Sequence, residues 1–147
     1  METKIIKKRI KHCIDLIYEN DPDLFNRANF EITISAKLAQ YLFIEFKEFD
    51  VDCEYDKHIN HQKRVENLDS NVRPDILIHK RGKDEDNLVY IEVKKEQNKT
   101  DRNIDFKKII EMTKLNGEYR YKVGIFIDFY KNKEDTIIKY FINGEEK

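Results

Sequence analysis

Two acidic residues and a lysine lie in neighbouring strand-like segments near the middle of the chain. Asp75 belongs to the first segment, and Glu92 and Lys94 belong to the second. If the turn between the segments spans residues 80–87, antiparallel pairing sets Asp75 opposite Glu92, with Cβ atoms about 4.5–5.5 Å apart. Lys94 is two positions beyond Glu92 and therefore projects from the same face. The spacing predicts two carboxylates and an amine on one side of a hairpin.

These residue types favour metal-assisted chemistry on a phosphodiester. Two carboxylates held so close repel each other, and a divalent cation between them would remove that conflict. A small number of hard oxygen ligands suits Mg²⁺ or Mn²⁺, with coordination left for water and phosphate. Such an ion polarises a phosphodiester and lowers the pKa of bound water. Lys94 would orient or deprotonate that water, or neutralise charge at phosphorus.

Each part of this pattern is common, and only the combination is informative. The acidic-x-Lys tripeptide also occurs at Glu2–Lys4, Glu45–Lys47, Asp105–Lys107 and Glu145–Lys147. Pro-Asp occurs twice, but only Pro74–Asp75 precedes a strand whose hairpin partner carries an acidic-x-Lys tripeptide. The alternative is structural: Asp75 begins a strand, while Glu92 and Lys94 belong to a solvated face with a cross-strand ion pair.

The first half of the chain is predicted to contain two helices and a strand. Helical spacing of apolar residues predicts an amphipathic helix over residues 3–19. A second helix is expected from Asn29, as its cap, to about Phe46. Its two apolar stripes predict burial over a broad face. Alternation in VDCEY predicts a half-buried strand, and residues 57–71 are expected to form a long polar loop.

The second half alternates between strands and a single helix. RPDILIH and NLVYIEVK are predicted strands, and a helix is expected over about residues 102–116, ended by Gly117. YKVGIFIDFY suits a buried central strand, and DTIIKYFIN is expected at a sheet edge. The predicted order is α, α, β, β, β, α, β, β, which indicates the α/β class.

Composition limits the protein's partners more than it identifies them. The 147 residues fit a single domain, 1–147. With 28 basic and 29 acidic residues, the net charge is −1, so a nucleic-acid partner would have to be met by a local patch. The two cysteines, Cys13 and Cys53, lack the spacing of a zinc site. Without a signal-peptide-like or membrane-spanning apolar run, a cytoplasmic location and no membrane association are expected.

The segments Arg73-Pro74-Asp75 and Ile91-Glu92-Val93-Lys94 resemble the signature of the PD-(D/E)XK nuclease superfamily. This resemblance implies a restriction-endonuclease-like αβββαβ core, with a mixed central sheet flanked by helices. It covers about residues 29–130 and leaves an extra N-terminal helix and a C-terminal edge strand outside. Small stand-alone bacterial members look most similar, on the segments NFEITISAKLAQYL, VDCEY, RPDILIHKRG and NLVYIEVKK.

The resemblance also implies roles for individual residues. Asp75 and Glu92 would bind Mg²⁺, for which Mn²⁺ would substitute, and the backbone carbonyl of Val93 would complete the inner shell. Lys94 would be the catalytic lysine. Glu31 would match an additional acidic residue that acts on the metal through water, although the helix macrodipole favours an acid in a first turn regardless of catalysis. The core motif shows no departure, which favours an active enzyme.

The expected function is a Mg²⁺-dependent nuclease that hydrolyses phosphodiester bonds by water attack on phosphorus, and DNA is a better-supported expectation for its substrate than RNA. The residues after the motif that could contact phosphates are Lys95, Gln97, Lys99 and Arg102. A second group of basic residues near the N-terminus could add to them: Lys7, Lys8, Arg9 and Lys11. A homodimer would let so small an enzyme span both strands of a duplex. Two alternatives stay open: a catalytically silent nuclease-fold module that binds nucleic acid or a protein partner, and a small-molecule phosphodiesterase.

Overall fold

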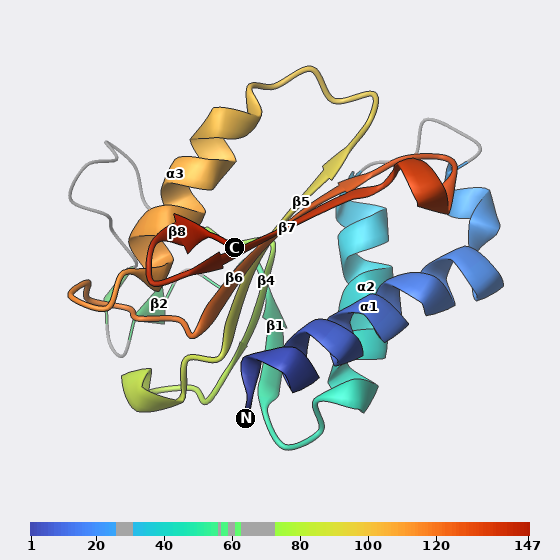
Figure 1. The fold of residues 1–147 in the computed structure, drawn as a ribbon. Coiled ribbons are helices and arrows are strands. Elements are labelled where there is room, and N and C mark those ends of the chain that lie inside the picture. The colour runs from blue at the N-terminus through green and yellow to red at the C-terminus, as the bar shows by residue number, and fades with distance from the viewer. Residues whose placement is uncertain (26–30, 56, 59–60, 63–72) are drawn as a thin grey trace.

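A mixed six-stranded sheet separates two helices on one face from a third helix on the other (Figure 1). The computed structural model describes residues 1–25, 31–55, 57–58, 61–62 and 73–147. The helices are α1 (Thr3–Asn20), α2 (Glu31–Glu45) and α3 (Arg102–Thr113). In spatial order the strands are β1 (Asp50–Cys53), β4 (Ile76–His79), β5 (Val89–Lys95), β6 (Val123–Phe129), β7 (Ile137–Ile142) and β8 (Glu145–Glu146).

Only one neighbouring pair of strands in this sheet is parallel. β5 and β6 run in the same direction and are joined through α3, which crosses the sheet between them. The other neighbours are antiparallel. A separate two-stranded sheet consists of β2 (Lys57–His58) and β3 (His61–Gln62), and single 3₁₀ turns occur at Pro22–Phe25, Asp84–Asp86 and Lys133–Asp135. The α/β class expected from the sequence is confirmed.

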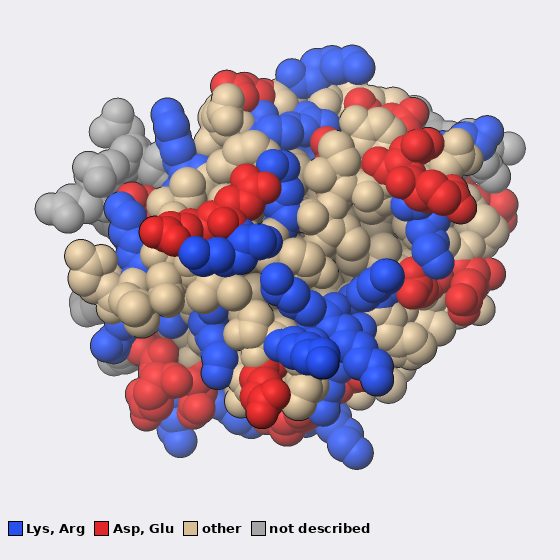
Figure 2. Space-filling view, viewed as in Figure 1, with Lys and Arg blue, Asp and Glu red and all other residues tan. Residues whose placement is uncertain are grey.

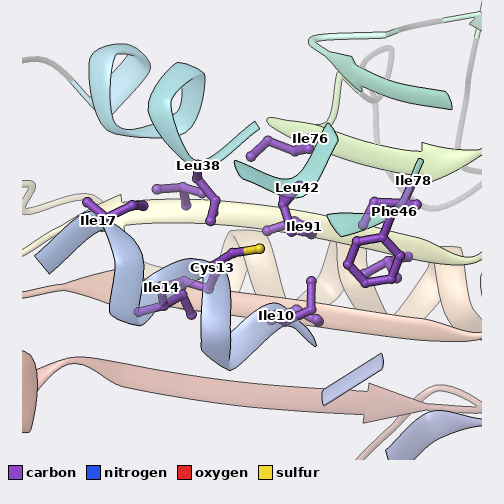
Figure 3. Close-up of a cluster of buried hydrophobic side chains, with 14 of the residues drawn as sticks. Ile10, Cys13, Ile14, Ile17, Leu38, Leu42, Phe46, Ile76, Ile78 and Ile91 are labelled. Carbon is purple, nitrogen blue, oxygen red and sulfur yellow. The ribbon is translucent and has the colours of Figure 1, made fainter. Parts of the chain in front are cut away.

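The larger hydrophobic core lies between the sheet and the α1–α2 layer. α1 contributes residues at helical spacing, and α2 and the strands face them: Ile6, Ile10, Cys13, Ile14, Ile17, Leu38, Leu42, Ile76, Ile78 and Ile91. Figure 3 shows Cys13 with its sulfur directed towards the side chains of Leu42 and Ile91, within this cluster. Burial raises the pKa of the Cys13 thiol to about 12, so this cysteine is a neutral core residue.

A smaller core fills the space between α3 and the opposite face of the sheet. Leu77 and Tyr90 point into it, whereas their neighbours Ile76 and Ile91 point into the larger core. This division follows from the two-residue period of a strand. Because both faces are covered, every described residue of β4, β5 and β6 except Lys94 is buried.

Several expected elements are confirmed, with shifted ends. The first helix occupies Thr3–Asn20, as predicted. The second begins its described part at Glu31, and its predicted cap, Asn29, lies outside the described residues. The third ends at Thr113 instead of 116, because Lys114 turns to an extended ψ of 132°. The backbone N–H of Tyr121 then donates to the carbonyl of Met112 (2.9 Å).

Three expectations about packing or loops were wrong. Residues 57–71 were expected to be a loop, but β2 and β3 form within them, and the rest of that range lies outside the described residues. The α2 stripe that contains Ile32 and Phe43 is not buried along its length, since these two side chains are 61% and 64% exposed, whereas the stripe of Ile34, Leu38 and Leu42 is buried as expected. β7 is not the outermost strand, because the two residues of β8 pair with it.

Among the described residues, no helix combines the length and the apolar character that crossing a lipid bilayer requires.

Gly124 of β6 permits the close approach of α3 to the sheet. A Cβ at this position would overlap Cγ2 of Ile109 and lie 2.9 Å from Cγ2 of Thr113. We therefore expect Gly124→Ala to lower the free energy of unfolding by about 1–3 kcal/mol, measured by urea denaturation. The double variant Ile109→Ala/Gly124→Ala should lose less unfolding free energy than the sum of the losses in the two single variants. Strictly additive losses would contradict this account of the α3–sheet contact.

Candidate metal and catalytic site

The register of β4 against β5 sets the geometry of the candidate site. Ile76 pairs with Ile91, Leu77 with Tyr90 and Ile78 with Val89. This is the register expected from the symmetry of the 80–87 turn. Asp75 lies one position before β4, and the next step of the same register is Glu92.

Asp75 is tied to the edge of β5 by its own side chain. Its Oδ2 accepts a hydrogen bond from the backbone N–H of Val93 (2.7 Å), and its carboxyl group also hydrogen-bonds that of Glu92. Glu92 and Lys94 alternate with Tyr90, a residue of the α3-side core, so they share the α3 face. The structure thus brings Asp75, Glu92 and Lys94 together on one side of the sheet.

Glu92 is an acid in an almost water-free position. It is 2% exposed, and burial raises its pKa well above the ordinary range, with the nearby charge of Asp75 adding to the effect. The hydroxyl of Tyr90 donates a hydrogen bond to its Oε1 (2.6 Å), and this bond lowers the pKa of Glu92 without cancelling the rise. Burial also raises the pKa of Asp75, against the hydrogen bonds from Val93 and Glu92. Without a cation, the pair is therefore biased towards sharing a proton.

Lys94 is held by an acid that sequence analysis discounted. Its Nζ lies 3.4 Å from Oδ2 of Asp105 in α3, and the other oxygen of Asp105 lies 3.5 Å from Nζ of Lys108. Burial lowers the pKa of Lys94, but Asp105, Glu31 and Asp75 outweigh it, so the pKa of Lys94 is raised. In this state Lys94 is a protonated cation and not a base.

Asp105 is the main residue of the site that the sequence-based argument missed. It is 2% exposed, and the Lys94 ammonium, 3.4 Å from its Oδ2, supplies the opposite charge that so buried a carboxylate needs. In the sequence, Asp105 appeared only as one of several acidic-x-Lys tripeptides that carry no information on their own. Its helical spacing was the available signal, because Asp105, Ile109 and Met112 form one buried stripe at i, i+4 and i+7. An acid on such a stripe requires a partner in the core.

Glu31 lies beside the acid pair and not within it. Its Oε2 accepts from the backbone N–H of Lys95 (3.0 Å), and its Oε1 accepts from the side-chain amide of Asn98 (2.6 Å). These bonds join the first turn of α2 to the end of β5. Its charge also helps to raise the pKa of Lys94. Glu31 therefore belongs to the electrostatic surroundings of the site.

The four proposed phosphate contacts have different surroundings. Gln97 and Lys99 are exposed, whereas Lys95 is only 5% exposed. The guanidinium of Arg102 donates to both carboxylate oxygens of Asp128 (3.0 and 3.2 Å) and to backbone carbonyls of the loop after β5. Arg102 therefore clamps that loop against β6, which leaves Gln97 and Lys99 as the accessible members.

The donor set is compatible with a small, hard divalent cation. The described residues include no group of three or more His, Cys, Asp or Glu side chains positioned to hold a metal. The available donors are two carboxylates and the nearby backbone of Val93, which is a set suited to Mg²⁺ because that ion retains several water ligands. A cation would also offset the burial that raises the pKa values of Asp75 and Glu92, and the charge of Asp75 that adds to the shift of Glu92.

Comparison with protein-family models gives no match for this chain, and comparison with curated proteins gives none either.

The acid pair of Asp75 and Glu92 should make the metal-free protein less stable as the pH rises. Between the ordinary carboxyl pKa and the raised native value, the folded protein binds more protons than the unfolded chain, so raising the pH through this window lowers stability. In the presence of a chelator, Glu92→Gln should be more stable than wild type at neutral pH and should flatten this dependence. Thermal unfolding across pH values measures both effects.

The matched control is Glu85→Gln, which removes an exposed carboxylate elsewhere in the protein. It should reproduce the wild-type pH profile. A Glu92→Gln profile identical to that of wild type would contradict the assignment of raised pKa values to this pair.

Proposed function

We propose that this protein is a metal-dependent nuclease of the PD-(D/E)XK type that hydrolyses phosphodiester bonds in DNA. The observation that supports the proposal most directly is the meeting of Asp75 and Glu92 at the β4–β5 hairpin. Both have raised pKa values, and Lys94 projects from the same face. Glu92 is 2% exposed, and an acid pair that includes so buried a carboxyl group destabilises a fold, which is explained if the pair binds a cation.

The chain's own residues divide the chemical work. Asp75, Glu92 and the carbonyl of Val93 would hold Mg²⁺, or Mn²⁺ in its place, with Glu31 acting through a water molecule. When bound, the ion supplies positive charge to the phosphate and lowers the pKa of a coordinated water. Lys94 remains protonated beside Asp105 and adds a fixed positive charge where the phosphorane-like negative charge develops.

The exposed loop after β5 would guide the substrate towards the carboxylates. Gln97 and Lys99 are exposed there, and Arg102 holds the loop to β6 through Asp128. Binding energy from such contacts orients the scissile phosphate, which is a major part of catalysis when the transferring group is already charged. We propose a homodimer as the form that cuts both strands of a duplex.

A catalytically silent nuclease-fold module is the second candidate, and one observation favours it. The described residues contain no cluster of three or more His, Cys, Asp or Glu side chains that could hold a metal ion, and Lys94 already forms an ion pair with Asp105. A module of this kind would bind nucleic acid or a protein partner without turnover. It would show neither a carboxylate-dependent Mn²⁺ site nor cleavage.

Metal binding and cleavage should depend on the same two carboxylates. Excess Mn²⁺ at about 100 times Kd should stabilise the wild type by about 2.7 kcal/mol, or roughly 5–10 °C in Tm. Asp75→Ala and Glu92→Ala should lose both this shift and cleavage of DNA. Lys94→Ala should lose cleavage while keeping the Mn²⁺ shift.

Circular dichroism should show that all three variants remain folded, and Glu85→Ala should behave as wild type in both assays. A Tm shift in the wild type without cleavage would separate metal binding from catalysis and favour the silent module. Cleavage that persists at the wild-type rate in all three variants would refute the nuclease proposal.

Asp105 should act as a positioning residue for Lys94. Its removal frees the ammonium from its only buried anchor on α3, so Asp105→Asn should lower kcat about tenfold or more and leave KM for DNA nearly unchanged. Asp105→Glu keeps the charge and should recover part of kcat. Steady-state kinetics with Mn²⁺ measure this difference, and equal kcat values for Asp105→Asn and wild type would exclude the role.

A further inference from the structure

The N-terminal half of α1 carries a row of lysines that we call the basic strip: Lys4, Lys7, Lys8 and Lys11. Lys4, Lys8 and Lys11 are exposed, and the ammonium of Lys7 lies 4.3 Å from the ring centre of Tyr140. Figure 2 shows basic side chains gathered over this half of the helix. Within the described part of the chain, none of the four makes an ion pair. Arg9, in contrast, is paired with Glu45 and Glu48.

This arrangement destabilises the helix that bears it. The positive end of a helix macrodipole disfavours cations in the first turns, yet α1 has no acid in its first turn. Lysines at i and i+4, such as Lys4 with Lys8 and Lys7 with Lys11, repel each other along one side of the helix. The first acid after the strip, Asp15, is bound to Lys133 (2.9 Å) and so is engaged elsewhere. Within the described residues, Lys4, Lys8 and Lys11 therefore have no acidic ion-pair partner.

Because the apolar face of α1 is buried in the core, a lipid surface is a poor fit as the anionic partner of the basic strip. Helices that bind lipid surfaces insert an apolar face, but the apolar face of α1 is already committed to the core: Ile6, Ile10 and Ile17 are each 0% exposed. What remains outside is a line of point charges on a rigid rod. From Lys4 to Lys11 the helix rises about 10 Å. Because lysine side chains are long and flexible, ammonium groups spread over this length can each reach a phosphate of one nucleic-acid backbone.

We propose that the basic strip of α1 binds the phosphate backbone of nucleic acid without sequence preference. α1 covers the face of the sheet opposite α3, whereas Glu92 and Lys94 face α3, so this surface is distinct from the candidate catalytic site (Figure 1). The strip would hold nucleic acid outside the carboxylate site. The inference does not depend on catalysis, because a silent module would use the same surface.

The test compares two triple variants that carry the same change in net charge. Lys4→Gln/Lys8→Gln/Lys11→Gln neutralises the strip, and Lys83→Gln/Lys122→Gln/Lys131→Gln neutralises three exposed lysines outside α1. Binding to a fluorescent mixed-sequence DNA duplex is followed by anisotropy at several salt concentrations, with a chelator present to prevent cleavage.

Loss of three phosphate contacts should reduce the slope of log K against log salt by about 2.7. Between about 50 and 200 mM salt, wild type and the control variant should therefore lose about 40-fold more affinity than the strip variant. Neutralising the strip should also leave Tm unchanged or raise it, because repulsion within α1 is relieved.

Three results would overturn the proposal: a wild type that does not bind the duplex, equal losses in the two triple variants, or a strip variant with the wild-type salt slope. Wild-type binding to phosphatidylserine vesicles but not to DNA would assign the strip to lipid and also overturn it. Asp75→Ala should bind the duplex at least as tightly as wild type under the same conditions, so a failed nuclease and a failed strip give different results.

Discussion

The antiparallel pairing of β4 with β5 is the constraint on which the rest of the molecule depends. In this register, one side of the hairpin supplies Ile76, Ile78 and Ile91 to the larger core, and the other side supplies Glu92 and Lys94. A slip of one residue would exchange the two sets and bury charges between the sheet and the α1–α2 layer. The same strand-pairing hydrogen bonds therefore fix the hydrophobic core and the positions of Glu92 and Lys94. The site cannot shift without unfolding the centre of the protein.

The parallel β5–β6 pair then determines what can reach these charges. Parallel neighbours need a crossover, and here the crossover is α3, whose first turns lie over the carboxyl end of β5. This path delivers Asp105 to Lys94, and Arg102 to Asp128 on β6. The close approach at Gly124 holds α3 at the required depth. The crossover helix that a parallel strand pair requires thus also carries the residues that hold Lys94 and the loop after β5.

Sequence patterns predicted what is local or periodic, and they failed where distant contacts decide. The helices, the main strands and the β4–β5 register followed from spacing and from the length of one turn. Asp105 was missed because its importance comes from a lysine eleven positions away that meets it only after the crossover has formed. Ile32 and Phe43 were expected to be buried because periodicity shows which faces of a helix are apolar, and not how many of them have a neighbour.

The distribution of charge suggests why the acids and the unpaired lysines lie on different layers. A buried carboxylate pair repels a phosphate backbone, and a near-neutral chain offers little general attraction to offset that repulsion. A cation at the acid pair would reverse the local sign only where it is bound. A strip of lysines on α1 acts over about one Debye length in physiological salt and needs no metal. Placing it across the sheet keeps the lysines from pairing with Asp75 and Glu92, so each feature would retain the charge that its proposed role requires.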